Sequence, residues 1–67
     1  MPPRVGDILI ISHWDVWFDV ARVGAEIIGR TNSKRDALLM ARNASANGPV
    51  WFVNVGGTPV RLDGESD

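Results

Sequence analysis

Residues 12–20 read SHWDVWFDV and place two tryptophans and a phenylalanine within five residues, separated by aspartates. Side chains alternate between the two faces of a β-strand. A strand over residues 16–22 would therefore turn one apolar set of side chains toward a core and leave Trp17 on the opposite face, between two carboxylates. The core set is Trp14, Val16, Phe18 and Val20, and the opposite set is Asp15, Trp17, Asp19 and Ala21.

Two other candidate strands, residues 7–12 (DILIIS) and 50–55 (VWFVNV), are apolar at both odd and even positions. Strands of this kind are typically buried on both faces, whereas a single helix covers only one face of a sheet. We therefore expect the second face to pack against another subunit. An alternative stays open, in which a bulge near Gly24 or His13 reverses the alternation and turns Trp17 into the core. The residues expected at the subunit interface are Leu9, Ile11, Trp17, Trp51 and Val53.

The clearest helix signal begins at Ser33. Ser33-Lys34-Arg35-Asp36 resembles a capping box, in which a serine side chain accepts a hydrogen bond from the backbone three residues later. Good helix formers follow, with Ala37, Ala41 and Ala44 on one stripe. A glycine and a proline in Asn47-Gly48-Pro49 predict the end of the helix.

The remaining segments complete the predicted fold. Residues 25–30 and 58–62 are short strand candidates, and Gly56-Gly57 predicts a hairpin turn before a last strand that Pro59 would confine to an edge. The predicted order is β-β-β-α-β-β, an α+β domain with a small antiparallel sheet and one helix on one face. It forms a single domain over residues 1–67, with flexible ends at 1–6 and 63–67.

Size and composition restrict how such a domain is stabilised. The 67 residues include no cysteine and one histidine, which excludes disulfides and leaves no convincing zinc ligand set, so we expect no cofactor. Domains of this size often need a partner subunit, and a homodimer is therefore expected. The apolar run at residues 8–11 is too short for a membrane span or a secretory segment, which predicts no membrane partner and a cytoplasmic protein.

The charge distribution leaves nucleic-acid binding open as the alternative function. The net charge is −1, but residues 22–42 hold five basic residues and only Glu26 and Asp36 as acids. Such cations can bind phosphates, and an outward Trp17 or Trp51 can stack on unpaired bases. The competing interpretation is an ordinary solvated helix face. The five basic residues are Arg22, Arg30, Lys34, Arg35 and Arg42.

An enzyme needs reactive groups that converge, and none of the candidate sets does so in the sequence. Ser12 and His13 are neighbours in a strand and should point to opposite faces, which separates nucleophile from base. Asp15 and Asp19 lie four strand residues apart, about 13 Å, and are expected to solubilise the rim around Trp17. Pro2 is a possible N-terminal base of the tautomerase type, but three strands precede the helix here. We therefore predict a non-enzymatic interaction module that self-associates through the face of the sheet without the helix or through an edge strand.

The motifs, taken in order, resemble the DUF2188 family of short bacterial proteins of unknown function. That family has a His and then a Trp in an early strand, a T-K-x-E-A helix start, an A-R pair within the helix and a late glycine turn. The resemblance covers about residues 8–66, departs at Asp19, where the family has Val, and implies a small sheet with one packed helix and no known activity. The matching positions are His13, Trp17, residues 33–37 (SKRDA), Leu38, Ala41, Arg42, Ala44, Gly57 and residues 63–66 (DGES).

Overall fold

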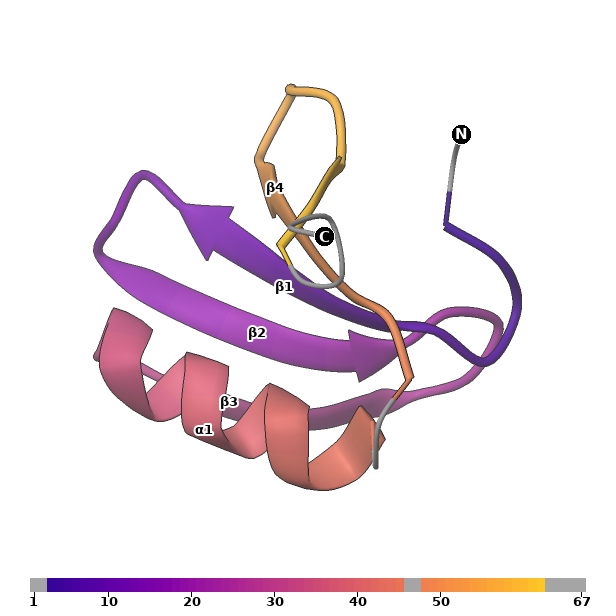
Figure 1. Ribbon diagram of the computed structural model, residues 1–67. Coiled ribbons are helices and arrows are strands. Elements are labelled where there is room, and N and C mark those ends of the chain that lie inside the picture. Colours follow the sequence, from indigo (N-terminus) through magenta and orange to yellow (C-terminus); the bar gives the residue numbers. More distant parts are fainter. Residues whose placement is uncertain (1–2, 46–47, 63–67) are drawn as a thin grey trace.

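The computed structural model describes residues 3–45 and 48–62 and forms a five-stranded sheet with one helix lying across one face (Figure 1). The α+β prediction is confirmed at this level. The sequence-predicted flexible residues 1–2 and 63–67, the candidate base Pro2 and the helix-stop residue Asn47 lie outside the described residues. The elements are β1 (Ile8–His13), β2 (Trp17–Arg22), β3 (Ile27–Thr31), α1 (Lys34–Ser45), β4 (Val50–Asn54) and β5 (Val60–Arg61).

The sheet is mixed, and the prediction of a strictly antiparallel sheet was wrong. Its strand order is β3-β2-β1-β4-β5, and β4 runs parallel to β1 while the other neighbours are antiparallel. The reason is the helix. Because α1 carries the chain back along the sheet after β3, the next strand starts from the same end as β3 and β1 and must run in their direction.

The β1–β2 hairpin closes through a three-residue loop, residues 14–16, in which Trp14 and Asp15 have φ angles of 55° and 61°. The Val16 N–H donates to the His13 carbonyl at 3.0 Å, and the Asp15 N–H donates to Ser12 Oγ at 3.2 Å. Two positive φ angles match the twist that hairpins require. The prediction that Trp14 and Val16 face the helix was wrong, because the turn places them before the strand alternation begins, 73% and 62% exposed.

Helix α1 begins as its sequence predicts. Ser33 Oγ accepts a hydrogen bond from the Asp36 N–H at 3.3 Å, and the Ser33 carbonyl accepts from the Ala37 N–H at 3.0 Å. The Ser33 N–H donates to Thr31 Oγ1 instead of to Asp36. The cap therefore uses one half of the capping box together with the last residue of β3.

The core lies between the sheet and α1. Ala37 and Ala41 are fully buried on the helix, and their small side chains let it approach the sheet closely. At Gly29 a Cβ atom would lie 2.6 Å from Met40 Sδ, so the absence of a side chain there makes room for the methionine. The sheet side of the core consists of Ile8, Ile10, Phe18, Val20 and Val50.

The register of the β1–β2 ladder shows which face of the sheet carries Trp17. It runs without a break from Ile8 opposite Arg22 to His13 opposite Trp17, and the bulge between β2 and β3 falls at Val20 and Ala21. Phe18 therefore faces the helix and Trp17 faces away from it, as the alternation predicts. Within residues 3–45 and 48–62 no helix is long and apolar enough to cross a membrane.

Candidate functional site

The face of the sheet opposite α1, called here the helix-free face, is built of three rows of side chains that cross the strands. Directly opposed residues in a ladder point to the same side of a sheet. The ladder registers therefore place all five of the predicted interface residues on this face. The first row is Ile27, Ala21, Leu9, Trp51 and Arg61, the second is Arg30, Asp19, Ile11 and Val53, and the third is Trp17 and His13.

The middle of the helix-free face is apolar and only half-covered. Leu9, Ile11 and Val53 are partly buried there, as is Trp17 toward one end of the face, and no second helix packs over them in the described part of the chain. Trp51 is more enclosed, with 7% of its surface exposed. Its indole N–H donates to Asp7 Oδ2 at 3.1 Å, which fixes the ring against the segment before β1.

Polar and aromatic side chains join at one end of this face in a group called here the Asp19 cluster, which consists of Asp19, His13, Arg30 and Trp17. Arg30 Nε donates to Asp19 Oδ1 at 2.6 Å, and His13 Nε2 lies 2.9 Å from Asp19 Oδ2. The His13 ring stacks on Trp17 at 4.7 Å between centroids, with 16° between the planes. The Arg30 guanidinium carbon lies 5.6 Å from the centroid of Trp17. Each member thus contacts two others.

The electrostatics of the cluster centre on a buried carboxylate. The Asp19 side chain is 5% exposed, whereas that of Arg30 is 62% exposed. The hydrogen bond from Arg30 lowers the pKa of Asp19 most strongly; burial opposes this, and the contact with His13 adds to the lowering. The same bond raises the pKa of Arg30. The carboxylate is therefore held in its charged form on a largely apolar surface.

The expectation that Asp19 solubilises the rim around Trp17 was wrong. Asp19 is 4% exposed and lies directly opposite Arg30 in the β2–β3 ladder. The sequence alone does not reveal this β2–β3 register, which brings together two residues 11 positions apart. Asp15 lies at the tip of the hairpin, where its carboxylate accepts a hydrogen bond from Ser12 Oγ.

The residues that resembled catalytic groups do not converge. Ser12 is fully buried on the helix side of β1, and His13 lies on the helix-free face. A nucleophile and its base must lie within hydrogen-bond reach, so Ser12, His13 and Asp15 do not form such an array. In the described part of the chain no group of three or more His, Cys, Asp or Glu side chains could hold a metal ion.

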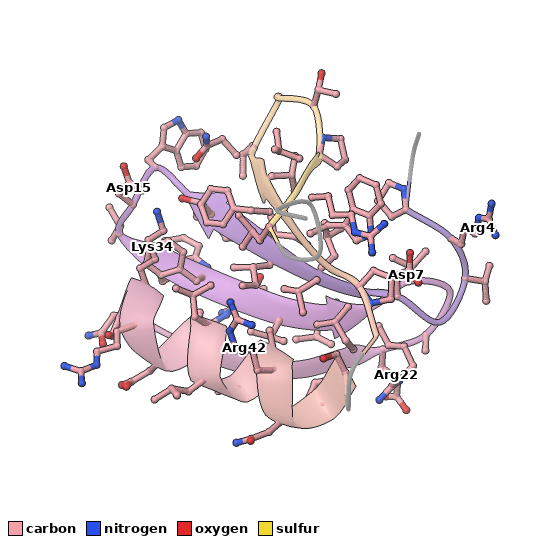
Figure 2. The ribbon with its side chains drawn as sticks, in the orientation of Figure 1. Arg4, Asp7, Asp15, Arg22, Lys34 and Arg42 are labelled. Carbon is pink, nitrogen blue, oxygen red and sulfur yellow. The ribbon has the colours of Figure 1, made fainter. Side chains whose placement is uncertain are left out.

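The five basic residues of the nucleic-acid alternative do not share one surface. Arg30 lies on the helix-free face in its bond with Asp19, while Lys34 Nζ lies 4.9 Å from the centroid of Phe52. Figure 2 shows Lys34 and Arg22 at opposite ends of the molecule, with Arg42 on the helix between them. Arg35 is exposed on α1.

The chain was compared with protein-family models, with curated proteins and with solved structures. None of the three comparisons gave a match. The resemblance to the DUF2188 family therefore stays a prediction.

Proposed function

We propose that this protein is a non-enzymatic interaction module that self-associates through the helix-free face of its sheet. The observation that carries the proposal is the set of half-buried apolar side chains Leu9, Ile11 and Val53 in the middle of this face, with Trp17 at one end of it and α1, the only described helix, on the opposite face. Contiguous apolar surface of this kind is typical of interaction sites. Aromatic and aliphatic anchors near the centre of an interface carry most of its energy.

The charge pattern of the face supports a second copy of the chain as its partner. The carboxylate of Asp19 is already neutralised by Arg30 within the same molecule. Two copies meeting face to face therefore bring no unpaired Asp19 carboxylate into the contact. A strongly acidic or basic partner would find no opposite charge there, because the middle of the face is apolar.

The dimensions of the face predict a weak association. Four strands of five or six residues and the two-residue β5 span at most roughly 24 Å by 17 Å, or about 400 Å² of projected surface. Stable specific complexes bury about 800 Å² per partner. We therefore expect a dissociation constant of about 1–100 μM, so that monomer and dimer coexist in ordinary preparations.

The test is a pair of lysine substitutions at two partly exposed leucines. Leu9→Lys places a charge in the central strand of the helix-free face, whereas Leu39→Lys places one on α1, where the leucine is 56% exposed. Sedimentation velocity at about 200 μM should show the Leu9 variant as a monomer and the Leu39 variant at the wild-type mass. Circular dichroism checks that both variants fold. If both retain the wild-type mass, the helix-free face is not the interface.

Nucleic-acid binding is the alternative that the same preparations can test. The dispersal of Arg22, Arg30 and Lys34 over different parts of the surface gives it less support than a single basic patch would. A titration with fluorescent oligonucleotides at about 50 mM salt is the sensitive measurement, because phosphate contacts weaken steeply as salt rises. Binding that is lost on replacing Arg30, Lys34 and Arg35 would favour this alternative.

A further inference from the structure

Trp14 is an exposed aromatic side chain whose position is not explained by packing within its own chain. It lies in the loop between β1 and β2 with a φ of 55°, and 73% of its surface is exposed. A left-handed backbone is unfavourable for a bulky residue, and such strain is concentrated at functional positions. The centroid of its ring is 6.5 Å from that of His13, which lies on the helix-free face. The ring therefore borders this face at the hairpin end of the sheet.

A hollow of about 720 Å³ lies at the opposite end of the sheet, where β1 and β4 begin. Figure 2 shows Arg4 and Asp7, which line the hollow, at this end of the molecule and Asp15 of the hairpin loop at the other. The hollow also borders the helix-free face, because Trp51 lines it and belongs to the first row of that face. The remaining lining residues are Pro49, Pro59, Val60 and Arg61.

The wall of the hollow suits an apolar side chain. Pro49, Pro59 and Val60 supply apolar contacts, and 60% of the Val60 surface is exposed. Trp51 adds little to these contacts, because only 7% of its surface is exposed. A tryptophan side chain buries about 150–250 Å² when it is enclosed, and the hollow has a volume within the range of small-molecule sites. One indole ring therefore fits a hollow of this volume.

The polar part of the lining suits an uncharged group that carries an N–H donor. Arg4 and Asp7 have opposite charges that offset one another, and Arg61 already has a partner. Asp7 accepts the Arg4 backbone N–H and the Trp51 indole N–H on one oxygen, Oδ2. An ionised carboxylate accepts hydrogen bonds on both of its oxygens, so Asp7 can receive a further donor. An incoming tryptophan brings one, because a buried indole N–H usually finds an acceptor.

We propose that two copies pack face to face with their strands antiparallel, so that Trp14 of each copy occupies the hollow of the other. The inference rests on the proposed self-association through the helix-free face. A two-fold axis that lies in the contact plane and runs across the strands places the hairpin end of each sheet over the opposite end of its partner. Every contact then occurs twice.

The area of the contact also favours a second copy as the occupant of the hollow. The helix-free face alone offers about 400 Å² of projected surface, whereas stable complexes bury about 800 Å² per partner. Two reciprocal Trp14 contacts add the surface of one ring and one hollow to each copy. They therefore supply part of the area that the face alone lacks.

The first test is the dissociation constant of the dimer, measured on the full chain by sedimentation equilibrium. Trp14→Ala removes the ring, Val60→Lys places a charge in the hollow, and the control Leu39→Ala removes a 56% exposed side chain from α1. All three residues are exposed, so the variants should fold, which circular dichroism checks. We expect the first two to weaken the dimer at least tenfold, because an enclosed tryptophan is often a hot spot. Leu39→Ala should leave the dissociation constant unchanged.

The second test is the relative direction of the strands in the two copies. The chain has no cysteine, so Val16→Cys, at a position that is 62% exposed, provides one attachment site for a nitroxide spin label. Labelled copies mixed with ¹⁵N wild-type chains should broaden the amide signals of Asp7 and Val60. Broadening at His13 and Trp17 instead would mean that the strands run parallel, and it would overturn the proposal.

The outcomes distinguish this inference from the proposed function. If the wild type dimerises and Leu9→Lys is a monomer, but Trp14→Ala keeps the wild-type dissociation constant, the helix-free face is the interface and the Trp14 contact is overturned. A wild type that stays monomeric at about 1 mM would overturn both. Weakening by both Trp14→Ala and Val60→Lys, together with broadening at Asp7 and Val60, is the result that the proposal predicts.

Discussion

Arg30 lies directly opposite Asp19 across the β2–β3 ladder and donates to it a 2.6 Å hydrogen bond on the face of the sheet that α1 leaves uncovered. The carboxylate also contacts His13, so one buried acid links β1, β2 and β3. This arrangement stabilises the charged end of a face that is otherwise apolar. It also orients His13 and Arg30 around the ring of Trp17.

Replacing Asp19 should destabilise the fold. Asp19→Ala leaves two donors on the helix-free face without their acceptor, and loss of a buried hydrogen-bonded group costs roughly 1–3 kcal/mol in the free energy of unfolding. Urea denaturation measures the change. Glu26→Ala, at an exposed turn position, is the control and should stay within about 0.5 kcal/mol of the wild type. Similar midpoints for both variants would show that the Asp19 cluster does not stabilise the domain.

Stability should fall in acid in a way that depends on Asp19. Its pKa is lower in the folded protein than the ordinary value of 3.8, chiefly because of the bond from Arg30. The stabilisation from this carboxylate is therefore complete above about pH 4 and is lost as the pH falls through the folded pKa. Thermal melts from pH 6 to pH 2 should show a shallower acid decline for Asp19→Asn than for the wild type. Melting temperatures that fall equally with pH in both proteins would show that the acid-dependent loss of stability does not come from Asp19.

Trp17 should tolerate phenylalanine much better than alanine. Its Nε1 atom is buried and has no hydrogen-bond partner among the described residues. Trp17→Phe removes that unsatisfied donor and keeps an aromatic ring against His13, so we expect stability within about 1 kcal/mol of the wild type. Trp17→Ala removes the ring and should cost about 3 kcal/mol. Chemical denaturation measures the free energy of unfolding of both variants. Equal losses of stability in the two would mean that ring stacking contributes little.

The hairpin turn should become more stable with a residue that suits its backbone. Trp14 has a φ of 55° and is 73% exposed, so its side chain contributes little packing in return for an unfavourable conformation. Left-handed backbone costs most residues about 1–2 kcal/mol, and asparagine adopts it more readily. Trp14→Asn should therefore raise stability by about 0.5–1 kcal/mol in a thermal melt. An unchanged or lower melting temperature would show that the exposed ring stabilises the hairpin.

Local patterns in the sequence predicted the features that depend on near neighbours. The serine cap of α1 follows from Ser33 and Asp36, three residues apart, and the orientation of Trp17 follows from strand alternation. The Asp19 cluster and the parallel pairing of β1 with β4 depend on how distant segments align. No local pattern encodes that alignment, because Arg30 meets Asp19 only after β3 pairs with β2 in one particular register.

Trp14 is a residue whose position is predicted wrongly by the alternation of side chains along a strand. Its spacing from Phe18 predicts a core position, yet it lies in the three-residue loop between β1 and β2, where the strand period does not apply. Turns of this type usually contain asparagine and glycine, and a Trp-Asp pair does not signal one. Residues 13–15 read as a tight turn in the sequence, which includes Trp14 and Asp15 but not Val16, the third residue of the loop.

The most direct test of the central claim, self-association through the helix-free face, is the mass in solution. Light scattering coupled to gel filtration, over a dilution series from about 1 mM to about 1 μM, covers the expected dissociation constant. The account predicts a mass near twice the chain mass of 7.3 kDa at the highest concentration, falling toward the chain mass on dilution. A mass of 7.3 kDa at every concentration would contradict it.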